Sequence, residues 1–197
     1  MLEHLKNNRK FYKLDVTGTE TLSTDNEFGI AYEEIDRLHE LCINNTDLSE
    51  IQMKLNAIKD SGTNINHYIN AFGCNLLFFV SSPEVLNLLL EHGCDPDHRS
   101  NGFDKSCVDN TMPACTAIHY AGSFFIWSAV QVLAKAMNDP NVLDDDECSA
   151  MGYAQHYYDE LVHDKKKGYL TVSDSVLEKM ELMLKKMSEM GLQPVYL

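Results

Sequence analysis

Recurring segments constrain the fold of this chain more than any other feature of its sequence. Thr116-Ala-Ile-His-Tyr-Ala121 and Ser149-Ala-Met-Gly-Tyr-Ala154 share one pattern, in which Ile118 and Met151 occupy the same apolar position 33 residues apart. A period of this length is typical of repeat proteins, in which each unit is one supersecondary structure. A helix pair cannot bury its apolar face alone, so the pattern predicts a stack of neighbouring units.

An upstream segment extends the pattern. Leu77 occupies the same position 41 residues before Ile118. The longer interval indicates an insertion, which we place between Arg99 and Met112. Between Leu77 and this insertion, residues 83–92 form an amphipathic pattern that ends at Gly93. This is typical of a short helix with a glycine C-cap.

Residues 116–121 differ from the T-P-L-H-x-A signature of ankyrin repeats by Ala117 in place of proline, while Ile118 fills the leucine position. The chain therefore resembles the ankyrin-repeat family over roughly residues 31–197, most specifically at 73–97 and 115–133. The resemblance implies an all-α fold, namely an ankyrin-like helical-repeat solenoid of about four helix pairs with two loop insertions. The His position of the signature holds Phe78 and Gly152 in two repeats, and another type of α-helical repeat stays open as an alternative.

The resemblance also suggests boundaries. Residues 1–30 lack the repeat pattern and form an N-terminal cap or extension, in which 12–17 are expected to be extended. Repeats are expected at about 31–69, 70–98, 99–142 and 143–197, with insertions at about 99–113 and 159–174. The expected helix pairs are 32–43 with 48–59, 75–81 with 83–92, 116–124 with 127–137, and 149–158 with 175–190.

The charge of the chain limits its partners. Its 197 residues include 30 acidic and 16 basic residues, for a formal charge of −14. Binding to nucleic acid phosphates needs a basic face, and adhesion to anionic lipid needs basic clusters. We therefore expect no direct binding to nucleic acid or membrane, and instead a basic partner or mimicry of a polyanion.

The same sequence suggests a compartment. No apolar run approaches the roughly 18 residues that span a bilayer, and no apolar stretch follows the N-terminal basic residues as in a secretion signal. The six cysteines are expected to be free thiols, because a chain of this length can bury a core without disulfides. We expect a cytoplasmic protein, or one delivered into a host cell cytosol if it is a bacterial effector.

Catalytic chemistry has one suggestive pair. Cys115 precedes His119 by four residues, and an imidazole can activate a thiolate. In the resembled family, however, this histidine is structural and bonds the Thr side chain and the loop backbone. The sequence has no phosphate-binding Gly-rich loop, no G-x-S-x-G and no H-E-x-x-H motif. We expect no enzymatic activity and no cofactor, while an active site in the insertions, with Cys107, Cys115 and His98, stays open.

Metal binding also has candidate ligands. They are Cys107, Cys115, His98 and His92, but seven residues separate the two cysteines, whereas zinc sites use closer pairs. Residues 144–147, three aspartates and a glutamate, could hold a hard cation. They lack the alternate spacing and turn glycine of an EF-hand loop, so we expect a solvated acidic loop and no metal.

The resemblance implies protein binding through a concave surface of inner helices and finger loops. Aromatic residues fall at positions where exposure is expected, and acidic residues stand beside them, which is typical of interface anchors. The predicted partner-binding residues are Phe72, Arg99, Phe103, Phe124, Asp144, Asp145, Asp146, His156 and Tyr157. The alternative is that these aromatics pack against the inserted loop. Phe79, Tyr120 and Tyr153 share another position and are expected to stack between inner helices, with a binding stripe as the alternative.

The leading hypothesis is a non-enzymatic protein–protein interaction module whose partner protein has a basic and apolar surface. Its irregular repeats resemble those of ankyrin effectors that intracellular bacteria deliver into host cells, and a eukaryotic adaptor would look similar. The alternative is an acidic polyanion mimic that blocks a nucleic-acid-binding protein. Mimicry predicts a steep loss of binding with added salt, whereas an aromatic-anchored interface loses little.

Overall fold

The structure, a computed structural model, describes residues 12–14, 20–22, 24–44, 47–101 and 113–196. The strands β1 (Tyr12–Leu14) and β2 (Glu20–Leu22) form an antiparallel pair in which Tyr12 lies opposite Leu22. The helices are α2 (Tyr32–Asn44), α3 (Leu48–Asp60), the short 3-10 helix η1 (Ile65–His67), α4 (Pro83–Glu91), α5 (Ala117–Ser123), α6 (Trp127–Ala136), α7 (Ala150–Lys167) and α8 (Asp174–Glu189). Apart from the one pair of short strands, the regular elements of the described residues are helices, as the all-α class predicts.

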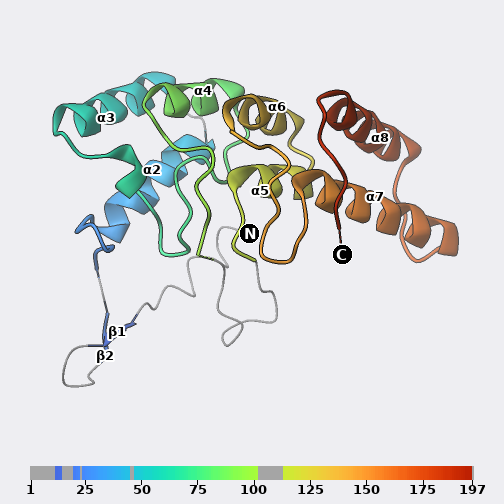
Figure 1. The fold of residues 1–197 in the computed structure, drawn as a ribbon, viewed down its shortest axis with the longest axis horizontal. Helices are drawn as coiled ribbons and strands as arrows, with labels where there is room; N and C mark the ends of the chain where they lie inside the picture. The colour runs from blue at the N-terminus through green and yellow to red at the C-terminus, as the bar shows by residue number, and fades with distance from the viewer. Residues whose placement is uncertain (1–11, 15–19, 23, 45–46, 102–112, 197) are drawn as a thin grey trace.

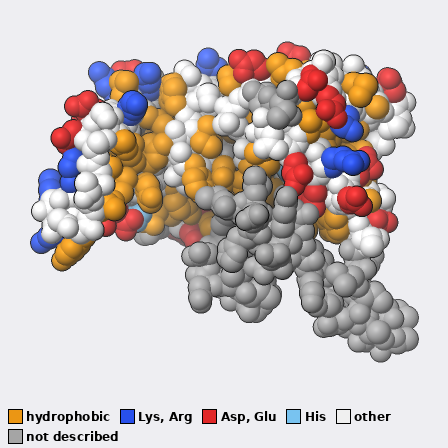
Figure 2. Space-filling model, turned by 180° about the vertical axis from the view of Figure 1, so that it is seen from behind, with side chains coloured by type: hydrophobic (Ala, Val, Ile, Leu, Met, Phe, Trp, Pro, Cys, Tyr) orange, Lys and Arg blue, Asp and Glu red, His pale blue; other side chains and the backbone are white. Residues whose placement is uncertain are grey.

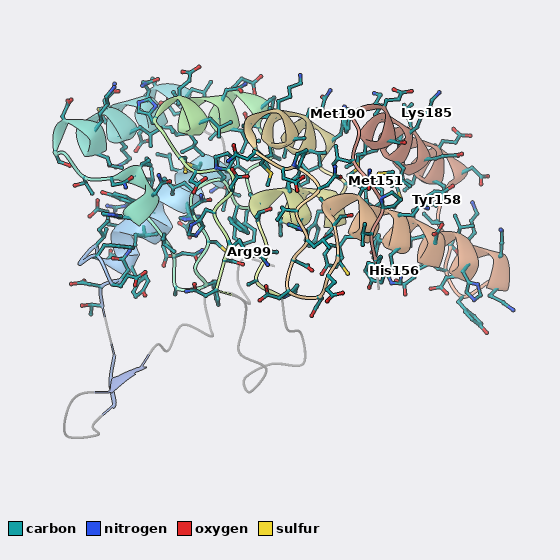
Figure 3. All side chains as sticks on the ribbon, in the orientation of Figure 1. Arg99, Met151, His156, Tyr158, Lys185 and Met190 are labelled. Atoms are coloured by element: carbon teal, nitrogen blue, oxygen red, sulfur yellow. The ribbon has the colours of Figure 1, made fainter. Side chains whose placement is uncertain are left out.

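The helices form two layers (Figure 1). In that view α3, α4, α6 and α8 make the upper layer, and α2, α5 and α7 make the lower one. Helix α5 packs on α6 and α7, α4 packs on α6, and α7 packs on α8. Met151 and Tyr158 point from α7 toward α8, whereas His156 lies on the lower side of α7 (Figure 3). In the C-terminal half, each lower-layer helix thus lies against both its lower-layer neighbour and an upper-layer helix.

One hydrophobic core runs through both layers. The positions that define the sequence period, Leu77, Ile118 and Met151, are all buried, which confirms that they face the core. Each helix from α2 to α8 contributes to this core, through residues such as Ile35, Ile51, Leu86, Ile118, Leu133, Met151 and Met187. Apolar burial of this kind is the main term that stabilises a stack of helices.

The helix expected at residues 75–81 is absent, and the prediction is wrong there. Residues 76–79 form turns, and Phe79 has a φ of 69°, a left-handed conformation that stops a right-handed helix. Ser82 already caps α4 through its Oγ, and Pro83 occupies the first turn of that helix. The chain therefore reverses within a few residues of Asn75, which leaves no room for a full helix.

The loop expected at residues 159–174 is wrong for 159–167, because α7 continues to Lys167. No glycine or proline interrupts the chain between Tyr153 and Lys167. Gly168, with a φ of 74°, then ends the helix in the left-handed conformation, and α8 begins at Asp174. The polar residues of this segment belong to an exposed helix rather than to a loop insertion.

His39 is a buried titratable group in α2. Its side chain is 5% exposed, and among the described residues its Nε2 atom has no hydrogen-bond partner. Burial lowers the pKa of His39 to about 4, although a hydrogen bond with the backbone of Tyr68 opposes that shift. The folded chain therefore holds a neutral imidazole at this position.

This burial makes stability depend on pH. The unfolded chain binds a proton at His39 near a pKa of about 6.5, well above the folded pKa, so protons favour unfolding. The contribution of neutral His39 is complete above that pH and is lost as the pH falls toward the folded pKa. Between pH 7 and pH 5 we expect its loss to lower the free energy of unfolding by about 2 kcal/mol, measured by urea unfolding.

His39→Leu is expected to remove this part of the pH dependence, because leucine does not titrate. His163→Leu is the matched control, since His163 is exposed on α7. An equal fall in stability between pH 7 and pH 5 for the wild type and His39→Leu would contradict the assignment.

Candidate functional site

The loops that begin at Asn26, Asn70 and Asp144 share one hydrogen-bond pattern. Their first residues, Asn26, Asn70 and Asp144, each accept on the side-chain Oδ1 from the backbone N–H groups two and four residues later, at 2.9–3.1 Å. The N–H of each first residue donates to the carbonyl of that fourth residue. Ser100 makes the closing pair of hydrogen bonds with Cys115, since its N–H donates to the Cys115 carbonyl and its Oγ accepts from the Cys115 N–H. Three loops therefore share the full construction, and Ser100 repeats its closing pair.

The sequence carries a signal for these loops that the 33-residue pattern does not include. Asn26-Glu-Phe-Gly29 and Asn70-Ala-Phe-Gly73 repeat the pattern Asn-x-Phe-Gly. Both glycines have a left-handed backbone, with φ of 77° and 73°, and Glu147 takes the equivalent position with a φ of 59°. The loop pattern therefore extends to residues 26–30, which precede the repeats expected from the sequence.

Asparagine side chains connect successive units in a matching way. The Nδ2 of Asn66 donates to the Gly93 carbonyl at 2.9 Å, and its Oδ1 accepts from the Asp95 N–H at 2.8 Å. Asn141 makes the same pair of hydrogen bonds with Gly191 and Gln193, at 3.1 and 2.8 Å. These amides satisfy backbone groups that follow α4 and α8, so they fix the spacing between neighbouring units.

His119 connects α5 to the loop before α7. Its Nδ1 lies 3.0 Å from the Thr116 Oγ1 and accepts from the Thr116 N–H, while its Nε2 lies 3.2 Å from the Cys148 carbonyl. Its side chain is buried, and burial lowers the pKa of His119, which favours the neutral form. The hydrogen bonds expected from the sequence, to a threonine side chain and to loop backbone, are confirmed.

The thiol of Cys115 is not paired with this imidazole, because both ring nitrogens of His119 have other partners. The Cys115 Sγ instead accepts a weak hydrogen bond from Ser100 Oγ at 3.9 Å. Burial raises the pKa of Cys115 to about 11. A thiol with such a pKa stays protonated at neutral pH, so it is a poor nucleophile.

A pocket of about 600 Å³ opens next to His119. Aromatic rings from two helices and the C-terminal segment line it, together with carboxylates from the loop before α7. The lining side chains that bear on its chemistry are Tyr120, Phe124, Tyr153, Tyr196, Asp144 and Asp146. The rings of Tyr120 and Phe124 lie 4.5 Å apart, and Tyr196 meets Tyr153 edge-on at 5.7 Å.

The pocket gathers three of the predicted partner-binding residues, Phe124, Asp144 and Asp146. Phe124 is 48% exposed at the end of α5, and Asp146 is exposed. Asp144 is instead 5% exposed, so the prediction of a solvated residue is wrong for it. Its Oδ1 holds the loop backbone, and its Oδ2 accepts from the Tyr153 hydroxyl at 2.6 Å, which accounts for its burial.

Other predicted residues hold loops together. Arg99 donates to the carbonyls of Ala114 and Leu143 and pairs with Asp145 at 2.7 Å, so it joins two loops below the helices (Figure 3). Phe72 is half-buried and packs against the core. Phe103, like Cys107, lies outside the described residues.

His156 and Tyr157 lie on α7, beside the pocket. The rings of His156 and Tyr196 stack at 4.0 Å, and Tyr157 is 50% exposed. The expected stacking between inner positions is confirmed for Phe79 and Tyr120, whose rings meet edge-on at 4.6 Å. Tyr120 and Tyr153 also line the pocket.

The C-terminal segment places Tyr196 at this site. Ser149 N–H donates to the Val195 carbonyl at 2.8 Å, and Ser149 Oγ donates to the Gln193 carbonyl at 2.6 Å. A Cβ atom at position 152 would overlap the Val195 carbonyl, so Gly152 is required for this approach. Gly152, which lies 33 residues after His119, therefore admits the backbone that carries Tyr196.

The candidate metal ligands His98 and His92 have other partners. His98 Nε2 bonds the Gly73 carbonyl at 2.7 Å, and His92 Nδ1 bonds the Leu88 carbonyl at 2.8 Å. Within the part of the chain that the structure describes, no three His, Cys, Asp or Glu side chains are arranged to hold a metal ion. The five described cysteines are buried free thiols.

Comparison of the sequence with models of known protein families and with curated proteins finds no match. Among the described helices, none is both long and apolar enough to cross a bilayer. Function is therefore inferred from the site itself.

Proposed function

We propose that this chain is an ankyrin-type repeat protein that binds a partner protein through the face formed by α5, α7 and the loops before them. The repeated loop hydrogen bonds at Asn26, Asn70, Ser100 and Asp144 support four units of one construction. The two layers of helices and the shared core support stacking of these units (Figure 1). A stack of this kind presents an extended surface of loops and inner helices.

One observation carries the proposed binding face, namely large aromatic rings exposed on adjacent helices beside a pocket. Phe124 at the C-terminal end of α5 and Tyr157 on α7 are 48% and 50% exposed, and the two helices pack on each other. Aromatic residues near the centre of a surface are the usual anchors of protein interfaces. Figure 2 shows apolar side chains exposed over much of the back of the molecule.

The charges beside these rings indicate the chemistry of the partner. Asp146 and Glu147 are exposed in the loop before α7, and Asp159 and Glu160 are exposed along that helix. A partner with lysine or arginine around an apolar anchor would complement this surface, and the charge would also raise its association rate.

Phe124→Ala combined with Tyr157→Ala is expected to abolish partner binding, because the two changes remove the exposed anchors. The measurement is affinity capture from cytosolic extract, in which proteins bound by the wild type should fall at least about tenfold with the double variant. Capture by the wild type should persist at high salt, since apolar anchors are not screened.

Met53→Ala combined with Leu182→Ala is the matched control. Both residues are exposed, at 63% and 51%, but on the upper-layer helices α3 and α8. If the two double variants capture the same proteins as the wild type, the proposed face is wrong. Binding that disappears with salt and ignores both double variants would favour polyanion mimicry.

A further inference from the structure

We propose that the pocket between α5, the loop before α7 and Tyr196 receives a lysine or arginine side chain of the partner protein. The inference rests on the proposed function, because it assigns part of the same face to one group of the partner. Its basis is the combination of an open cavity, aromatic walls and carboxylates that no cation of the described chain neutralises within the pocket.

The walls of the pocket suit a cation. Tyr120 and Phe124 form one aromatic wall from α5, and Tyr153 with Tyr196 forms the other. The face of an aromatic ring carries partial negative charge, so rings around a cavity attract ammonium and guanidinium groups. The apolar ring surfaces also accommodate the aliphatic stem of lysine or arginine.

The charges in the pocket point the same way. Asp144 and Asp146 line it, and no lysine or arginine does so among the described residues. Arg99 is engaged elsewhere, since its guanidinium pairs with Asp145 and bonds two carbonyls. Asp144 is held by backbone N–H groups and the Tyr153 hydroxyl, all of which are neutral donors. The pocket therefore has excess negative charge that a partner cation would neutralise.

The rest of the lining agrees with this charge. His119 contributes no positive charge, because burial lowers its pKa. Burial and then the nearby thiol and carboxylates raise the pKa of Tyr196, so its hydroxyl stays neutral. The charge of Arg99 reaches Cys115 and His119 in the lining. Because Arg99 is paired with Asp145, Asp144 and Asp146 are the lining charges that a partner cation would meet.

The test uses three peptides of glycine and serine with one leucine at a fixed position. The first carries a lysine next to the leucine, the second an arginine, and the third a glutamine. Two-dimensional NMR of the full chain should show that the lysine or arginine peptide shifts the ring signals of Tyr120, Phe124, Tyr153 and Tyr196. The glutamine peptide should bind at least about fivefold more weakly, because it lacks the charge.

Asp146→Asn is expected to weaken the lysine or arginine peptide by about fivefold or more, as for loss of a partly desolvated charge pair. Glu178→Gln makes the same change in net charge on the exposed surface of α8 and should leave affinity unchanged. Equal loss with both variants, or equal binding of the glutamine peptide, would overturn the proposal.

Two further outcomes separate the possible errors. Tetramethylammonium that binds the pocket as tightly as the peptides would indicate a free cationic molecule instead of a partner side chain. The double variant Phe124→Ala with Tyr157→Ala could lose capture from extract while Asp146→Asn keeps it. That result would leave the proposed function intact and reject the cation pocket.

Discussion

Replacing Gly122 with alanine is expected to lower the free energy of unfolding by about 3 kcal/mol or more. Gly122 lies near the end of α5, and a Cβ atom there would overlap the Ala150 carbonyl at the start of α7. The obstructing atoms are backbone, so relief requires that α5 and α7 move apart. Alanine favours a helix by about 1 kcal/mol over glycine, which makes a net loss the more informative result.

Urea unfolding measures this change, and Gly168→Ala provides its control. Gly168 has a φ of 74°, and no atom lies within 4 Å of the place that a Cβ would occupy. Alanine there suffers only the strain of a left-handed backbone, about 1 kcal/mol. If Gly122→Ala costs no more than Gly168→Ala, the close approach of α5 and α7 is not as described.

Replacing His119 with leucine is expected to cost about 3 kcal/mol, because it leaves several buried polar groups without partners. The backbone N–H and the hydroxyl of Thr116 both lose their partner, the Nδ1 atom of His119. The Cys148 carbonyl loses its donor, the Nε2 atom of the same ring. Thermal or urea unfolding gives the magnitude. Backbone NMR shifts should change mainly in residues 144–148, since that loop depends on the Nε2 contact.

A double-mutant cycle isolates the side-chain contact. In the background of Thr116→Val, His119→Leu should cost at least about 1 kcal/mol less than in the wild type, because the hydroxyl partner is already absent. His163→Leu, at an exposed position on α7, should have little effect. Additive costs of Thr116→Val and His119→Leu would contradict the coupled role of this pair.

Local sequence signals predicted most helix boundaries. Six of the expected helices begin and end within one residue of α2, α3, α4, α5, α6 and α8, because capping residues such as Asp47 and Ser82 fix helix starts. The helix expected at 75–81 does not form because Phe79 adopts a left-handed backbone, which the periodicity of apolar residues does not reveal. The loop expected after residue 158 is helical up to Lys167, because polar residues also form the exposed part of a helix such as α7.

The candidate site was predicted only in part. Exposure of Phe124 and Tyr157 followed from their positions after the signature alanines, because repeat position fixes the side of a helix that faces solvent. Burial of Asp144 and the bridging role of Arg99 did not follow, since both depend on hydrogen bonds that only the folded loops make. Tyr196 was missed because nothing local indicates that residues 193–196 return to the start of α7.

The sequence by itself determined the helical class, the period of the buried positions and most of the helix boundaries. These properties depend on interactions among residues a few positions apart, such as capping and helical periodicity. Only the tertiary structure decided that Tyr120, Phe124, Tyr153 and Tyr196 surround one pocket with Asp144 and Asp146. That arrangement depends on how closely α5, α7 and the C-terminal segment approach, which Gly122 and Gly152 permit by lacking a side chain.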